Sequence, residues 1–86
     1  MVKIKKNSNE LDAMQYNGKN ANEIMAWSGG KVDVVPYLKL VCVKTSGGNM
    51  YGTEGDYIVQ DENGDFCLYK PDFFEQEFDI IDWRPE

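Results

Sequence analysis

The sequence contains no histidine, the side chain that most often serves as general base or metal ligand near neutral pH. Its two cysteines, Cys42 and Cys67, lie far apart and are too few for a zinc site, and no apolar run approaches the roughly 20 residues that span a bilayer. Most hydrolase triads, thiolate metal centres and membrane anchors are therefore excluded. We expect a cofactor-free protein of a reducing cytoplasm, in which both cysteines are small buried thiols.

Positive charge is scarce in the second half of the chain. Residues 1–44 carry a net charge of +3, whereas residues 45–86 carry −9 together with eight of the eleven aromatic side chains. The overall charge of −6 opposes direct binding to a nucleic-acid backbone. A chain of 86 residues has room for one domain, and the aromatic residues predict that most of its core is built from residues 45–86.

The first third of the chain predicts one strand and one helix. Residues 1–9 have no sustained apolar period and read as a basic flexible arm or an edge strand, so that residues 10–86 form a single α+β domain. Residues 11–16 alternate as in a strand and end at an Asn-Gly turn. Asn20, with Glu23 three residues later, predicts a capped helix over residues 21–28.

The remainder of the chain predicts short antiparallel strands joined by glycine-bearing turns. Pro36 confines the residues before it to an edge or a bend, and the β-branched run that follows reads as the central strand. The expected elements are a hairpin of residues 38–45 and 50–52, a second hairpin of residues 56–60 and 65–70, a helical turn over residues 71–76 and a last strand over residues 77–83.

The fold class is therefore α+β, with a small curved antiparallel sheet or partial β-barrel of five to six strands and one short N-terminal helix. Exposed strand edges in so small a sheet favour pairing between copies, so a homodimer or higher homo-oligomer is expected.

Two loop motifs read as turns rather than as ligand sites. Asp61-x-Asn63-x-Asp65 has the opening spacing of a calcium loop, but the glycine is at position 64 and the position that should hold glycine is Phe66. Residues 46–49 are rich in glycine, yet no lysine follows them as in a phosphate-binding loop. Both motifs instead predict hairpin turns, and no metal site is expected.

An acidic run near the end of the chain is the candidate partner-binding site. Carboxylates at regular spacing next to aromatic rings can imitate a nucleic-acid backbone and enter the basic channel of a DNA-binding enzyme. Solvated positions on an edge strand are the simpler interpretation of the same residues. The candidate residues are Glu75, Glu77, Asp79, Asp82 and Trp83.

A second set of side chains is the candidate site for a small anionic ligand. Large aromatic rings can stack on a purine, and lysines can bind its phosphates. The residues of this alternative set are Trp27, Tyr51, Lys39 and Lys44.

Several motifs of the chain resemble a family of small phage and prophage proteins of undefined activity. The strand and turn over residues 11–20, the Gly-Asp-Tyr-Ile motif at residues 55–58 and the Lys-Pro-Asp-Phe-Phe-Glu motif at residues 70–75 are similar to that family's signature. Tyr16 replaces its usual tryptophan, and Phe73 its usual isoleucine. The resemblance implies a phage-encoded accessory protein of the bacterial host cytoplasm, and it carries over no catalytic residue.

These observations favour a non-enzymatic binding protein that interferes with a host process. The most plausible partner is a host defence enzyme or nuclease, bound through the acidic aromatic second half. The alternatives are a sponge that sequesters a nucleotide signalling molecule at a homo-oligomer interface and a minor structural protein of the phage particle. An enzyme is disfavoured because no nucleophile–base pair or metal-ligand set is present in the sequence.

Overall fold

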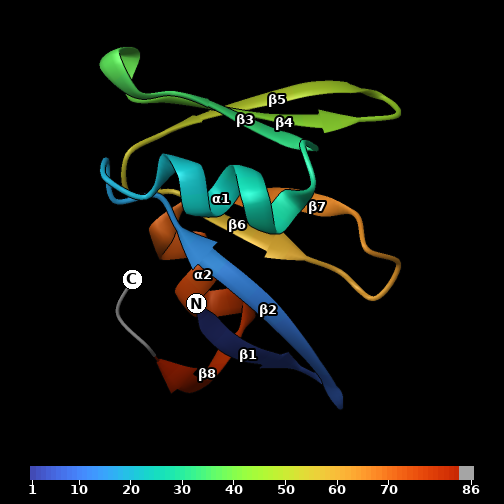
Figure 1. Ribbon diagram of the computed structural model, residues 1–86. Helices are drawn as coiled ribbons and strands as arrows, with labels where there is room; N and C mark the ends of the chain where they lie inside the picture. The colour runs from blue at the N-terminus through green and yellow to red at the C-terminus, as the bar shows by residue number, and fades with distance from the viewer. Residues whose placement is uncertain (84–86) are drawn as a thin grey trace.

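The computed structural model describes residues 1–83 and has an α+β fold (Figure 1). The described residues form eight strands in two antiparallel sheets, and two α-helices. The elements in chain order are β1 (Val2–Lys6), β2 (Asn9–Gln15), α1 (Ala21–Ser28), β3 (Val32–Val35), β4 (Leu40–Thr45), β5 (Gly48–Thr53), β6 (Tyr57–Gln60), β7 (Phe66–Tyr69), α2 (Pro71–Glu77) and β8 (Asp79–Trp83).

The larger sheet has the strand order β7-β6-β2-β1-β8. Strand β1 is thus an inner strand, and the prediction of a flexible arm or an edge strand over residues 1–9 is wrong. Val2 and Ile4 are buried on one face of the sheet, while Lys3 and Lys5 alternate with them on the other. Only two inward apolar residues mark this strand, too few for the sequence pattern to reveal it, and its second partner, β8, lies at the far end of the chain.

The smaller sheet has the order β3-β4-β5, and here the sequence interpretation is confirmed. β4 is central, and β3 is an edge strand that ends where Pro36 begins a short 3₁₀ turn over Pro36–Leu38. The hairpins β4–β5 and β6–β7 both form as predicted. The carboxylate of Asp61 accepts the N–H groups of Asn63 and Asp65 in the second hairpin, so this motif closes a turn.

Helix α1 spans the residues predicted for it, but its start is stabilised differently. Asn20 makes no side-chain capping bond to the helix. Its Oδ1 instead accepts the N–H of Asn17 at 3.0 Å and its Nδ2 donates to the carbonyl of Gln15 at 2.8 Å. The buried amide therefore closes the turn that leads out of β2, and Gly29 ends the helix in the left-handed conformation (φ 62°) that glycine adopts without a steric cost.

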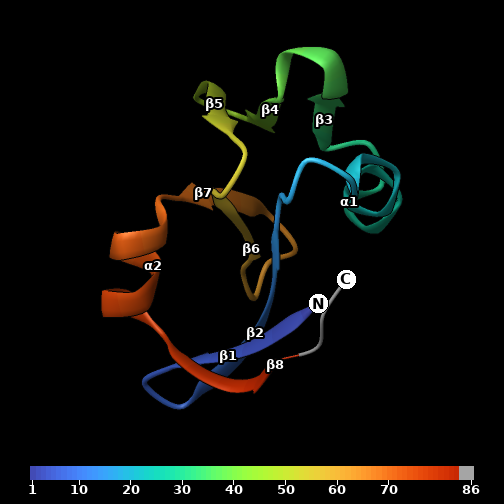
Figure 2. The same cartoon turned by 90° about the vertical axis from the view of Figure 1, so that its left-hand side faces the viewer.

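Two clusters of buried side chains lie on opposite faces of the larger sheet. The aliphatic cluster fills the space between this sheet, α1 and the smaller sheet; it contains Met14, Tyr16, Ala21, Ile24, Val32, Val34, Val41, Val43, Ile58 and Phe66. The aromatic cluster lies under α2; it contains Val2, Ile4, Ala13, Tyr57, Val59, Phe74 and Phe78. Figure 2 shows the two helices on the two sides of the larger sheet.

This arrangement corrects two further predictions. The α+β fold with small open antiparallel sheets is confirmed, but the described strands number eight in two sheets rather than five or six in one. Most buried hydrophobic residues precede residue 45, so the second half does not supply most of the core. Its buried side chains are fewer and include large aromatic rings, while two of its described aromatic side chains, Tyr51 and Phe73, are exposed.

Candidate functional site

The candidate site is the outer surface of α2, a helix held against the larger sheet by ring packing. Pro71 occupies the first helical position, where its missing N–H is no loss. Phe74 is fully buried, and its ring stacks on that of Tyr57 with centroids 3.8 Å apart. Phe78, four residues on, packs edge to face against Tyr69 at 5.2 Å. This i, i+4 pair fixes which side of the helix faces the sheet.

The first turn of α2 is tied to the turn before β6 by a buried carboxylate. Asp56 Oδ2 accepts a hydrogen bond from the Thr53 N–H and pairs with Lys70 Nζ, both at 2.9 Å. The side chain of Asp56 is only 4% exposed, whereas the ammonium of Lys70 is open to solvent. The two motifs of the phage-family resemblance, residues 55–58 and 70–75, therefore meet in space at this ion pair.

The last turn of α2 is tied to β1. Lys6 Nζ lies 2.7 Å from Glu77 Oε1 and 5.9 Å from the centre of the Phe78 ring. The hydrogen bond and the charge of Glu77 raise the pKa of Lys6 above its ordinary value of 10.5. Both ends of this short helix are thus tied to the larger sheet or to the turn before β6, and its outward side chains are presented on the far side from these contacts.

The outward residues of α2 combine one aromatic ring with two carboxylates. Phe73 is 53% exposed, and its ring lies 5.9 Å from that of Tyr69. Beside it is a pocket of about 290 Å³ lined by Leu68, Tyr69, Lys70 and Phe73. Asp72 and Glu75 are exposed and form no ion pair with any residue from 1 to 83. An exposed aromatic ring beside uncompensated carboxylates is the composition of a protein-binding surface with a basic partner.

Of the five acidic-run candidates, Glu75 pairs with no residue from 1 to 83, and lysines lie opposite three others. Glu77 is bound to Lys6. Asp79 and Asp82 lie on β8, in register with Lys5 and Lys3 of β1. Trp83 ends β8, and its side chain lies outside the described part of the structure. Among the five candidates, Glu75 on α2 is therefore an exposed carboxylate that no lysine of residues 1–83 pairs with.

The alternative ligand set does not form one site. Lys44 and Tyr51 share the outer face of the smaller sheet, where Lys44 pairs with Asp33 at 2.9 Å. Lys39 lies at the other end of that sheet, 3.3 Å from Glu54. Trp27 is on α1 below the sheet, with its ring edge to face against Phe66 at 5.0 Å. No single ligand contacts these four side chains within one copy of the chain.

A cleft between the two hairpin turns brings together two lysines of the first half, Lys31 and Lys44. It has a volume of about 470 Å³, and its lining includes Lys31, Lys44, Asp61 and Asp65. The negative charges of Asp61 and Asp65 would repel a phosphate group in this cleft. Cys67 also lines the cleft, and burial raises the pKa of its thiol above 9.0, which keeps it in the unreactive protonated form.

Comparisons with protein-family models, curated proteins and solved structures found no match to this chain. Within residues 1–83, no group of three or more acidic or cysteine side chains is placed to hold a metal ion, and neither helix is long and apolar enough to cross a membrane.

Sequence reasoning missed Asp72 and Phe73 as site residues. The adjacent phenylalanines at positions 73 and 74 look equivalent in the sequence, and only the packing of Phe74 on Tyr57 shows which of them faces outward. The spacing of Phe74 and Phe78 is the signal that could have found the site, because an i, i+4 apolar pair defines the inner side of a helix and leaves Phe73 on its flank.

Proposed function

We propose that this chain is a phage-encoded, non-enzymatic binding protein that inhibits a host defence enzyme or nuclease in the bacterial cytoplasm. The single observation that carries the proposal is the surface of α2, where an exposed phenylalanine stands beside two carboxylates that pair with no residue from 1 to 83, on a helix with an ion pair at each end. The motifs at residues 55–58 and 70–75, which resemble a phage family, support the phage setting.

The chemistry of the surface favours a basic protein partner. A partly exposed ring beside an apolar pocket can act as a central anchor, because aromatic side chains contribute most to interface energies. The carboxylates of Asp72 and Glu75 attract a positively charged surface and speed association with it. Enzymes that act on nucleic acids carry such surfaces in their substrate channels.

The rigid attachment of α2 adds to this argument. A surface that is already ordered loses little conformational entropy on binding. The ion pairs of Lys70 with Asp56 and of Lys6 with Glu77 hold both ends of the helix, and the stacked ring of Phe74 fixes its middle. The backbone that carries the outward side chains is thus already placed in the free protein.

A nucleotide sponge has less support from the geometry. Its candidate residues lie on different faces, and the cleft that holds Lys31 and Lys44 also holds two aspartates. A thermal-shift assay with cyclic nucleotides separates the two functions, because a ligand that binds the folded state raises the apparent stability.

The test of the proposed function reverses the charge of the helix surface. The chain is expressed in a bacterium that carries a nuclease-based defence system, and the plating efficiency of a sensitive phage is measured. We expect the wild-type chain to raise plating and the double variant Asp72→Lys, Glu75→Lys to lose this effect. Phe73→Ala should lose it as well, because the anchor ring is removed.

A matched control carries the same change of charge elsewhere. Glu62 and Asp65 are exposed in the β6–β7 turn, so Glu62→Lys, Asp65→Lys should protect the phage as the wild type does. Equal protection by the helix variant and the control would overturn the assignment of the site. Absence of protection by the wild-type chain against every nuclease system tested would overturn the proposed function.

A further inference from the structure

The edge strand β5 is the least protected edge of the two sheets within residues 1–83. It has six residues, none of them charged and none proline, and it pairs with β4 without a bulge. Each other edge strand has features that hinder pairing. β3 carries Asp33 and is followed by Pro36, and β8 carries two aspartates and a register shift against β1. β7 has only four residues and packs against the smaller sheet. Charges, prolines, bulges and short length are the usual means of preventing edge-to-edge pairing.

The free peptide groups of β5 belong to two residues. Thr45 and Gly48 flank a two-residue turn and form a hydrogen-bonded pair, so the bonds to β4 alternate from there along the strand. Asn49, Tyr51 and Thr53 consequently direct their main-chain N–H and C=O groups away from β4. Those of Thr53 are bonded to Asp56, which leaves Asn49 and Tyr51 open.

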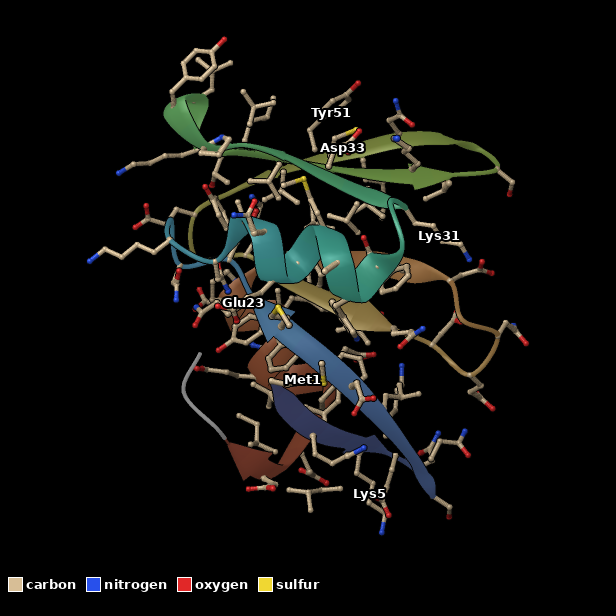
Figure 3. All side chains as sticks on the ribbon, in the orientation of Figure 1. Met1, Lys5, Glu23, Lys31, Asp33 and Tyr51 are labelled. Carbon is tan, nitrogen blue, oxygen red and sulfur yellow. The ribbon has the colours of Figure 1, made fainter. Side chains whose placement is uncertain are left out.

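Two apolar side chains along this edge are exposed. Tyr51 is 61% exposed on the outer face of the sheet, where Figure 3 shows it pointing away from α1. Met50 is 36% exposed on the opposite face. An uncharged edge with exposed apolar side chains on both faces has the features of a pairing surface rather than a solvated edge.

We propose that β5 pairs with β5 of a second copy of the chain in an antiparallel, two-fold symmetric dimer. The open groups of Asn49 match those of Tyr51 in the partner subunit, and those of Tyr51 match Asn49 of the partner subunit. This register places the two-fold axis beside Met50 and joins the two three-stranded sheets into one of six strands. No charged side chain of β5 faces its copy, so the edge is self-complementary.

The length of the edge sets the expected affinity. Four main-chain hydrogen bonds and the two exposed side chains of each copy bury less than the about 1,200 Å² that is typical of stable complexes. The dimer should therefore dissociate on dilution, with sedimentation velocity from micromolar to millimolar protein showing a shift from one copy to two.

Charged substitutions at residue 50 test whether the two-fold axis of the dimer lies beside this residue. Met50→Lys and Met50→Glu each place like charges directly opposite each other, so each variant alone should dimerise about tenfold more weakly than the wild type. Met50→Lys also brings the net charge closer to zero, which would strengthen a general association. An equimolar mixture of the two variants pairs lysine with glutamate and should restore dimer formation.

A second pair of variants tests the main-chain contact while each variant's fold is checked by thermal unfolding. The main-chain donor that Tyr51→Pro removes faces away from β4, so the substitution should abolish the dimer and keep the bonds to β4, whereas Tyr51→Thr keeps the donor and should retain the dimer; both variants lose the tyrosine ring. The proposal is overturned if the wild type stays monomeric at millimolar concentration, if the charge variants dimerise like the wild type, or if mixing them restores nothing.

Discussion

The two buried clusters of this molecule use different means to hold a helix against the same sheet. The aliphatic cluster encloses α1 between two sheets with valine, isoleucine and methionine side chains, and the helix has no ion pair to either sheet within residues 1–83. The aromatic cluster holds α2 from one side only, through stacked rings and an ion pair at each end.

This difference shows what a helix needs when only one side of it is covered. α1 can be held by aliphatic packing alone, because side chains of both sheets contact it. α2 has the larger sheet beneath it and solvent on its outer side, so it requires large rings and polar contacts at fixed points. The helix that is covered on one side is also the one whose outer side is free to bind.

The largest expected effect comes from the centre of the aromatic cluster. Phe74→Ala should lower the free energy of unfolding by about 3–5 kcal/mol, because it leaves a cavity and removes the ring that stacks on Tyr57. The neighbouring change Phe73→Ala removes an exposed ring and should cost about 1 kcal/mol or less. Urea unfolding of both variants measures this contrast, and equal losses would show that α2 does not pack through Phe74.

The junction of the two sheets should show the next largest effect. A Cβ atom at Gly52 would lie 2.6 Å from Leu68 Cδ2 and 2.7 Å from Asp56 Oδ2. Gly52→Ala is therefore expected to cost about 1–3 kcal/mol through overpacking. Gly47→Ala is the control, because nothing lies within 4 Å of its added atom, and it should change stability by about 0.5 kcal/mol or less.

A smaller change of opposite sign is expected in the aliphatic cluster. The hydroxyl of Tyr16 is fully buried and has no hydrogen-bond partner among residues 1–83. Tyr16→Phe should therefore raise the free energy of unfolding by about 1 kcal/mol, since it removes an unsatisfied polar group and leaves the packing unchanged. A loss of stability in thermal or urea unfolding would contradict this account of the hydroxyl.

The smallest expected effect is a dependence of stability on alkaline pH in the aromatic cluster. Burial, with a further contribution from the charge of Glu75, raises the pKa of Tyr57 above 10.0. The folded protein thus holds this proton to higher pH than the unfolded chain does. The stabilisation is fully present below pH 10.0 and is lost as the pH rises through the pKa of the folded state.

Urea unfolding across this pH range measures the decline. In Tyr57→Phe the decline should be shallower, although not absent, because burial also raises the pKa of Tyr69. An unchanged slope in Tyr57→Phe would remove Tyr57 as a source of the effect.

The local elements of this fold were predictable because their signals are local. Gly29 and the preceding apolar residues define α1, and turn residues define the hairpins β4–β5 and β6–β7. The inner position of β1 was not predictable, since it depends on pairing with β8. The role of Asn20 was missed because an amide suits a helix cap and a turn equally well in sequence, and only the position of the Gln15 carbonyl decides between them.

The sequence predicted that the candidate site is acidic, but not which residues form it. Glu75 belongs to the acidic run that the sequence singles out, and it lies on the proposed binding surface. The lysines of β1 lie opposite Glu77, Asp79 and Asp82, and sequence reasoning could not foresee this because it placed residues 1–9 outside the domain. The choice between Phe73 and Phe74 likewise required the position of Tyr57.

The pairing of β1 with β8 has a consequence for the order of events during synthesis. The hairpin of β1 and β2 and the meander of β3, β4 and β5 join neighbouring segments and can form as soon as those residues leave the ribosome. The outer edge of β1 has no partner until residues 79–83 have been made. On a slowly translated messenger RNA this edge therefore stays open to a chaperone or a neighbouring nascent chain for longer than the edge of β2, which pairs with β6.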